Sequence, residues 1–338
     1  MRPQTTGLTL GKYAPLHQGH QLVIETALAE VDELIILIYD SPEVTPVPLP
    51  VRAGWLRKLY PRARVIEAWD GPTQVGDTPA IRRAHEEYVI QRLKLRGITH
   101  FYSSEFYGEH MSRALGAANR LIDPDRQRVP ISATAIRQNP YAARAFIPAL
   151  VYRDLISNIA LLGAPSTGKT TLAERLAAVY GTVWMPEYGR EYWEKHQVER
   201  RLTPDQLVEL AEGHLEREER LLAQANQYLF TDTNALTTYM FALAYHGAVR
   251  PRLRQLAQEA TARYDLIFVC DSDIPYDDTW DRSGDVSRQI FQKQILADLR
   301  MRKLPFFLLR GSVEARVAQV ARVLERHYKY QNPAERRV

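Results

Sequence analysis

Two histidines three residues apart stand at the start of a predicted helix, in the segment GKYAPLHQGH at residues 11–20. One helical turn places His17 and His20 on the same side, and a helix N-terminus offers free N–H groups and a positive dipole end. Gly11 permits close approach of a ligand, and Pro15 stiffens the turn. The arrangement predicts a site for nucleotide phosphates. Surface histidines or a zinc site are the alternatives, but zinc needs further ligands, and no cysteine or Glu–His pair stands nearby in the sequence.

A second segment, ISATAIR at residues 131–137, carries donors of the same kind. Ser132 is predicted to be a helix N-cap whose neighbourhood is free for phosphate, and Thr134 adds another donor. Arg137 lies about a turn and a half along the helix, and its planar fork suits phosphate oxygens. A Ser-x-Thr pattern begins many helices, so this segment alone is not specific for phosphate binding. Together with residues 11–20 it predicts one shared phosphate site.

The two segments resemble the G-x-[FY]-x-P-x-H-x-G-H and I-S-x-T-x-x-R motifs of the nucleotidyltransferase superfamily. The resemblance implies adenylyl transfer to a nucleophile from ATP, with pyrophosphate as the leaving group. A phosphate nucleophile is already anionic and needs no general base, so catalysis would rest on orientation and charge stabilisation, and His17, His20 and Arg137 suit this catalytic role. The residues predicted to bind ATP here are Gly11, Lys12, Tyr13, His17, His20, Ser132, Thr134 and Arg137.

Residues 163–170 read GAPSTGKT, which is a complete G-x-x-x-x-G-K-[ST] phosphate-binding loop between a predicted strand and a predicted helix. Loop amides cradle phosphate, Lys169 reaches β- and γ-oxygens, and Thr170 is a ligand for Mg²⁺. The predicted ATP-binding residues of this second site are Gly163, Ala164, Pro165, Ser166, Thr167, Gly168, Lys169, Thr170 and Thr171.

Acidic residues beyond this loop predict a kinase. Asp232 ends an apolar run and could hold Mg²⁺ with Thr170; the alternative is a plain N-cap for the helix that follows. In EYGREY at residues 187–192, Glu187 could take a proton from a substrate hydroxyl. Arg190 could hold phosphate, and Tyr188 lies between them; the alternative is an ordinary charged helix start.

The stretch from Asp271 to Ser287 is polar and predicts a mobile lid over the phosphates, with Arg282 or Arg288 neutralising charge in the transition state. The alternative is a solvated loop. The lid is favoured because the stretch follows a predicted strand end, where ligands bind in folds of this class. Four of its acidic residues are Asp277, Asp278, Asp281 and Asp285.

Short apolar runs alternate with longer amphipathic stretches throughout the chain, which predicts βαβ units and an α/β fold with two doubly wound parallel sheets. We expect a nucleotidyltransferase domain at 1–145 and a P-loop kinase domain at 155–338, joined within 139–157. The predicted strands of the first half are Leu8–Tyr13, Leu34–Tyr39, Arg64–Ala68 and Thr99–Ser103, with helices Gln18–Glu30 and Pro79–Arg96. Those of the second half are Asn158–Leu162, Thr182–Trp184, Gln227–Thr231, Leu266–Cys270 and Pro305–Leu309.

Composition agrees with two globular domains: the chain has 338 residues, is 45% hydrophobic and 25% charged, and carries a net charge of +4. The mild charge suits anionic ligands, and without a dense Lys/Arg block it predicts no nucleic-acid partner. The single cysteine, Cys270, excludes an internal disulfide and is expected to be buried. The first seven residues are polar and no apolar run of about 18 residues occurs in the sequence, so we expect a cytoplasmic protein without a signal peptide or a membrane partner.

The combination resembles the bifunctional nicotinamide mononucleotide adenylyltransferase/ribosylnicotinamide kinase family, NadR, over nearly the whole chain. Besides the motifs above, the matching stretches are Ser104–Gly108 (SEFYG), Asp123–Arg126 and Glu187–Glu191 (EYGRE). The resemblance implies that the second domain phosphorylates nicotinamide riboside to the mononucleotide (NMN). It implies that the first joins NMN to AMP from ATP, giving NAD, with Mg²⁺ serving both. A homo-oligomer is compatible with the sequence.

The chain departs from the family pattern at several places. The first motif begins at Gly11, which leaves no room before it for the helix-turn-helix of some members, so we expect no DNA repression.

Pro186 stands where the family usually has Trp. Nicotinamide in these ligands is a cationic ring that calls for an aromatic face, and the candidates, each of which could instead be a core residue, are Trp55, Trp69, Trp184 and Trp193. The alternatives in function are another nucleotidyltransferase–kinase fusion and an NAD-sensing protein with one inactive domain.

Overall fold

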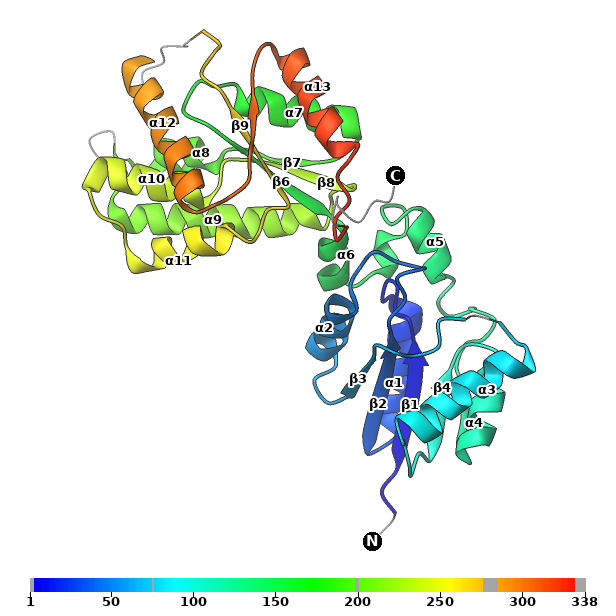
Figure 1. Ribbon diagram of the computed structural model, residues 1–338. Helices are drawn as coiled ribbons and strands as arrows, with labels where there is room; N and C mark the ends of the chain where they lie inside the picture. The colour runs from blue at the N-terminus through cyan, green and yellow to red at the C-terminus, as the bar shows by residue number, and fades with distance from the viewer. Residues whose placement is uncertain (1–2, 75, 198–200, 276–284, 332–338) are drawn as a thin grey trace. The chain divides into compact units, whose positions relative to one another are not determined.

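The computed structural model describes residues 3–74, 76–197, 201–275 and 285–331. The chain divides into two compact units, Met1–Tyr152 and Arg153–Val338, and Figure 1 shows each with its own sheet. Both sheets have five parallel strands flanked by helices, so the predicted α/β class with two doubly wound sheets is confirmed. Among the described residues, every helix is too short or too polar to cross a bilayer.

The sheet of the first unit has the strand order β3-β2-β1-β4-β5. Its strands are β1 (Thr6–Gly11), β2 (Glu33–Tyr39), β3 (Arg64–Ala68), β4 (His100–Ser103) and β5 (Ala118–Leu121). Its helices are α1 (Gln18–Glu30), α2 (Leu49–Leu59), α3 (Pro79–Glu87), a π-helix (Tyr88–Arg92), α4 (Gly108–Leu115), α5 (Ala133–Gln138), a 3₁₀ turn (Arg144–Phe146) and α6 (Ala149–Leu155), which crosses the division between the units.

The interior strand β2 is apolar on both faces because helices cover both sides of the sheet. Ile35 and Leu37 pack with Val89 in one cluster. Successive side chains of a strand point to opposite faces, so Ile36 and Ile38 face the other side, and both are fully buried. The first unit therefore presents only the strand ends to ligands.

Two predictions for the first unit differ from the structure. The predicted helix Pro79–Arg96 is α-helical only to Glu87 and continues as the π-helix, in which the Leu93 amide donates to the Tyr88 carbonyl. The wider turn buries Tyr88 and Val89 together. Strand β5 was not predicted, because all four of its residues are exposed and form no apolar run.

The sheet of the second unit has the order β10-β9-β6-β8-β7. Its strands are β6 (Ser157–Leu162), β7 (Trp184–Met185), β8 (Tyr228–Asp232), β9 (Leu266–Cys270) and β10 (Phe307–Leu309). Its helices are α7 (Lys169–Tyr180), α8 (Tyr188–His196), α9 (Pro204–Leu222), α10 (Ala235–His246), α11 (Pro251–Ala260), α12 (Asp285–Met301) and α13 (Val313–Leu324).

Helices cover both faces of this sheet as well (Figure 1). Ile159 of β6 faces α7 and α13, whose Leu172 and Val320 belong to the same cluster. The next residue, Ala160, faces α10, α11 and α12. Cys270 is buried at the end of β9, as expected. Because the strands are parallel, the ends of β6, β8 and β9 lie at one edge, where the loops that follow them can form a site.

Candidate functional site: a phosphate-binding turn in each unit

His17 and His20 lie against each other at the turn between β1 and α1. Their ring centroids are 3.8 Å apart. His17 is the N-cap of α1, and its Nδ1 accepts a hydrogen bond from the Gly19 amide at 3.1 Å. The Nδ1 atom of His20 is buried and has no hydrogen-bond partner among the described residues. The structure thus brings both histidines to one helix N-terminus, where they can act together.

Both imidazoles are electrically neutral at pH 7. Burial, with a smaller contribution from the charge of Arg126, lowers the pKa of His17 to about 4. Burial also places the pKa of His20 well below its usual value, with smaller contributions from His17 and Arg126. A neutral imidazole has one N–H donor, so each ring can donate one hydrogen bond to an anion without carrying a charge of its own.

The segment at residues 131–137 meets the first motif through its arginine. Ser132 is the N-cap of α5, with its Oγ accepting from the Ala135 amide at 3.2 Å. The Arg137 guanidinium donates to the Ala14 carbonyl at 2.7 Å and to the Thr134 hydroxyl at 3.0 Å. Arg137 therefore joins the two segments in this structure, which leaves its remaining N–H groups for a phosphate.

Two arginines that the sequence did not single out support this turn. The side chain of Arg52 on α2 is buried and donates to the carbonyls of Lys12, Tyr39 and Val47. The Lys12 ammonium pairs with Glu43 at 2.5 Å. The sequence offered one signal for this role of Arg52, namely a charged residue on the otherwise apolar face of α2. Arg52 fixes the backbone where β1 and β2 end.

Arg126 is the second of these arginines. Its charge acts on both His17 and His20, and its guanidinium pairs with Glu105 at 3.0 Å. The backbone around it is held by Asp123, whose carboxylate accepts from the amides of Arg128 and Val129 at 3.1 and 3.0 Å. Arg126 and Glu105 belong to the two stretches, 104–108 and 123–126, that the sequence analysis quoted without giving them a role.

The glycine-rich loop of the second unit runs from the end of β6 into α7. Gly163 has φ +143° and Gly168 has φ +79°, backbone conformations that glycine adopts readily. A Cβ atom on Gly163 would stand 2.6 Å from the Cys270 carbonyl oxygen. Lys169 is buried beneath the loop and donates to the Ala164 carbonyl at 3.0 Å. The close approach to β9 explains why the loop requires glycine at its first position.

Asp232, the last residue of β8, is fully buried beside this loop. Its Oδ2 accepts from the Thr170 hydroxyl at 2.5 Å, and its Oδ1 has no partner among the described residues. Burial raises the pKa of Asp232 to about 6, against the opposing charge of Lys169. The N-cap of α10 is Asn234, so the alternative of Asp232 as a plain N-cap is excluded. An unsatisfied carboxylate oxygen next to a threonine hydroxyl fits a hard cation.

A cavity of about 530 Å³ extends from the loop toward α8, α9 and α10. Glu187, Arg190 and His214 line it near the loop end with Lys169 and Thr170. Glu187 is the N-cap residue of α8, yet its side chain makes no capping bond. Outside the loop, much of the remaining lining is apolar or aromatic and includes Trp193, Leu202, Leu207, Leu210, Phe241 and Tyr245. Such a volume suits a small organic substrate whose reactive end points at the phosphates.

Other predicted residues of the second unit lie elsewhere. Tyr188 is not among the residues that line the cavity: its ring packs over Gly213 of α9 and under the Arg217 guanidinium, 3.8 Å away. Arg288 is buried near the loop and donates to the carbonyls of Ser166 and Ile274 at 3.3 and 3.2 Å. Three of the four acidic lid residues and Arg282 lie outside the described residues, and so does the predicted lid from residue 276 to 284.

The four candidate tryptophans divide between core and surface. Trp55 is 1% exposed, so its role as an aromatic face for a ligand is excluded. Trp184 packs against the core beneath α7. Trp69 is 59% exposed just beyond the end of β3. Trp193 lines the cavity of the second unit, which makes it the tryptophan best placed for a substrate there.

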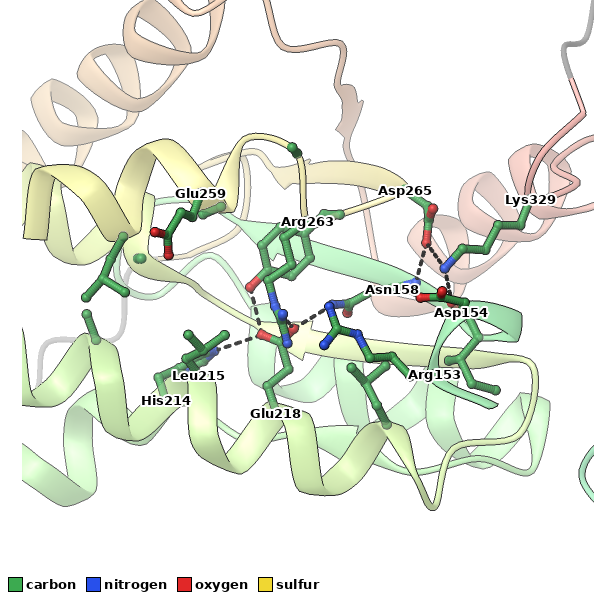
Figure 2. A pocket seen from close by; sticks show the side chains of 18 of the residues that line it. Arg153, Asp154, Asn158, His214, Leu215, Glu218, Glu259, Arg263, Asp265 and Lys329 are labelled. Atoms are coloured by element: carbon green, nitrogen blue, oxygen red, sulfur yellow. Dashed lines mark hydrogen bonds and ion pairs between the residues drawn. The ribbon is translucent and has the colours of Figure 1, made fainter. Parts of the chain in front are cut away.

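A buried polar network around Glu218 lies between α9 and the sheet (Figure 2). The Glu218 carboxylate accepts from the side-chain amide of Asn158, from the Arg263 Nε at 2.6 Å and from the Tyr264 hydroxyl at 2.7 Å. His214, one turn earlier on α9, lies 3.7 Å from the same carboxylate. It also lines the substrate cavity. The network joins α9 to β6 and to the residues before β9.

Comparison with known proteins assigns a family model to each unit. A model described as Cytidylyltransferase-like matches residues 8–139, and one described as AAA domain matches residues 158–316. The "Trifunctional NAD biosynthesis/regulator protein NadR" of Escherichia coli strain K12 is 27% identical over 337 residues, covering 90% of this chain and 78% of that protein.

Solved structures of NadR proteins share the fold along the chain. One in complex with NAD and AMP-PNP superposes with a TM-score of 0.57 and 24% identity, covering 98% of this chain and 97% of its own. Another, in complex with NR, gives a TM-score of 0.56 at 24% identity, with 96% of each chain covered.

Proposed function

The chain is homologous to the NadR proteins, and we propose that it is a bifunctional enzyme of NAD biosynthesis. The second unit phosphorylates nicotinamide riboside, and the first unit adenylylates the resulting mononucleotide to give NAD. The observation that carries the proposal is that one chain holds two intact phosphate-binding turns. Each follows a central strand of its own parallel sheet, the position where ligands bind in this fold class. The NadR structures hold NAD with AMP-PNP and NR, ligands that suit these two sites.

In the second unit, the 5′-hydroxyl of the riboside attacks the γ-phosphorus of ATP, a new O–P bond forms, and ADP leaves. Glu187 lines the cavity near the loop and its carboxylate can accept the hydroxyl proton. Lys169 and the loop amides stabilise the negative charge on the transferred phosphoryl group. Thr170 and Asp232 would hold Mg²⁺, which neutralises phosphate charge when bound.

The aromatic wall of the cavity selects the other end of the substrate. Nicotinamide riboside carries a positive charge on its ring, and an aromatic face attracts a cation. Trp193, Phe241 and Tyr245 line the cavity. His214 also lines it, and burial lowers its pKa, so the imidazole adds no charge that would repel the ring.

In the first unit, a phosphate oxygen of the mononucleotide attacks the α-phosphorus of ATP, and pyrophosphate leaves. No proton has to be removed from this nucleophile, so the unit needs donors and not a base. The N–H groups of His17 and His20 at the start of α1 supply them, together with the guanidinium of Arg137 in the last turn of α5. Fixed donors of this kind stabilise developing charge without reorganisation.

The proposal is tested by incubating the purified chain with labelled nicotinamide riboside, ATP and Mg²⁺ and separating the products by chromatography. We expect the mononucleotide to appear first and NAD to follow, with equal amounts of ADP and pyrophosphate at completion. A chain that produces neither labelled product, or that makes NAD without passing through the mononucleotide, contradicts the proposal.

A further inference from the structure

Arg316 is a fully buried arginine on α13 that the proposed chemistry does not use. Its Nε donates to the Gly311 carbonyl at 3.0 Å, and one Nη donates to the Thr167 carbonyl of the phosphate-binding loop. The other Nη donates to the Asp271 carbonyl at 3.1 Å and to the Asp273 carboxylate. Burying a guanidinium is costly unless its donors are paired. Here the paired donors converge on the loop and on the segments beside it.

The bond to Thr167 fixes the direction of the next peptide N–H. A trans peptide is planar, with its C=O and N–H pointing in opposite directions. Arg316 holds the Thr167 carbonyl toward α13, so the Gly168 N–H of the same peptide points away from α13, toward the interior of the loop. Amides directed this way are the groups with which such a loop holds phosphate.

Neighbouring peptides of the loop are held in the same manner from α12. Arg288 donates to the Ser166 carbonyl at 3.3 Å. Gln292 accepts from the Ala164 amide at 2.8 Å and donates to the Cys270 carbonyl at 3.0 Å. Side chains of two C-terminal helices thus fix the backbone of the loop at several points, and Arg316 makes the contact nearest to Gly168 and Lys169.

Arg316 also connects the loop to the strand ends beside it. Asp273, which pairs with Arg316, accepts from the Gly311 amide at 2.7 Å. Gly168 lies beside the Arg316 guanidinium, since a Cβ there would stand in ordinary contact, 3.8 Å from an Nη of Arg316. The planar guanidinium of an arginine can donate hydrogen bonds to several acceptors at fixed angles, whereas the ammonium of a lysine cannot.

We propose that Arg316 is a positioning residue for the phosphate-binding loop of the second unit, one that directs the loop amides toward ATP. The inference rests on the proposed kinase function, because it assigns the loop to ATP. It predicts that the loss of Arg316 affects the nucleotide and leaves the riboside cavity intact, since Arg316 does not line that cavity.

The test compares Arg316→Gln with the wild type in steady-state kinase assays. We expect the KM for ATP to rise and kcat/KM for ATP to fall by up to about 100-fold, the effect of a misplacement near 1 Å. The KM for nicotinamide riboside should stay unchanged. Arg316→Lys should restore only part of the loss. A residue that merely stabilises the fold would not separate the two KM values.

Arg310→Gln is the matched control, because Arg310 lies on the turn before α13 and pairs with the Asp271 carboxylate at 2.7 Å but is exposed. It should behave as the wild type. The inference is overturned if Arg316→Gln keeps the wild-type KM for ATP, or if both KM values rise together. Should Arg316→Gln not fold, Asp273→Asn, which removes the paired carboxylate, must raise the KM for ATP selectively or the inference fails.

A direct binding measurement separates this inference from the proposed function. ATP titrated into the full chain should fill a site in each unit, and Lys169→Ala identifies the one in the second unit by weakening it. Arg316→Gln should weaken the same site only. If the wild type phosphorylates no riboside but this pattern holds, the proposed function fails while the role of Arg316 stands; if Arg316→Gln leaves that site unchanged, the inference fails.

Discussion

At the scale of single residues, the histidine pair of the first unit predicts how adenylyl transfer responds to pH. Both imidazoles have a pKa below the usual value, near 4 for His17, so both are neutral from pH 6 to 8. His20→Asn should lower the rate by about 10²–10³-fold, the effect of losing one fixed donor.

The ratio of the wild-type rate to the His20→Asn rate should be constant from pH 6 to 8, because titration of the substrates cancels in that ratio. If the imidazoles acted as cations, the ratio would fall as the pH rises through about 6.5. Initial rates with the mononucleotide and ATP at several pH values distinguish the two cases.

The pKa of Asp232 predicts a different pH dependence for riboside phosphorylation in the second unit. Burial raises its pKa to about 6, and only the ionised carboxylate suits a cation, so kcat/KM for riboside phosphorylation should rise with pH through about 6 and then level. More Mg²⁺ should move this rise to lower pH. Asp232→Asn should reduce phosphorylation by at least about 10²-fold and spare adenylyl transfer. Retention of most kinase activity in Asp232→Asn would contradict the assignment.

At the scale of elements, the turn between β6 and α7 depends on the close approach of Gly163 to β9. Gly163→Ala places a Cβ 2.6 Å from the Cys270 carbonyl oxygen at φ +143°, so the turn must shift. We expect kinase kcat/KM to fall by about 100-fold. Gly181→Ala, at the end of α7, is the control: its φ is +60° and the added Cβ meets open space. It should cost about 1–2 kcal/mol of stability and leave both activities unchanged. Equal kinase activity in the two variants would contradict the account.

The elements that position the two sites could be predicted where a local pattern specifies them. The apolar runs that form β2 and β9 were predicted with almost their observed bounds, and the glycine-rich loop was predicted from its motif. Strand β5 could not be predicted, because its pairing with β4 is decided by the tertiary structure and its residues are exposed.

The side-chain contacts that fix the backbone of the two turns could not be predicted either, because they too form between segments that are distant in the sequence. Arg52 and Arg316 bind backbone carbonyls of distant segments, and carbonyls are present at every residue, so no spacing marks the partner. The aromatic wall of the cavity is assembled from α8 and α10, which are far apart in the sequence. Contiguous motifs thus predicted the phosphate-binding turns of both units, whereas the aromatic wall of the second unit's cavity required the structure.

At the scale of the whole molecule, the chain is a pair of compact units, each with its own sheet, core and phosphate-binding turn. The mononucleotide released by one unit is the nucleophile that the other requires. Because each unit contains its whole phosphate site, damage to one turn should leave the other reaction intact. A mixture of Lys169→Ala and His20→Asn chains should therefore make NAD from the riboside through free mononucleotide.

The most direct test of two separate phosphate sites is product chromatography on these two variants, each supplied with ATP, Mg²⁺ and either the riboside or the mononucleotide. Lys169→Ala should convert the mononucleotide to NAD but leave the riboside unchanged. His20→Asn should convert the riboside to mononucleotide, which accumulates. If either substitution abolishes both reactions in a chain that remains folded, the two turns do not serve separate reactions and the account is wrong.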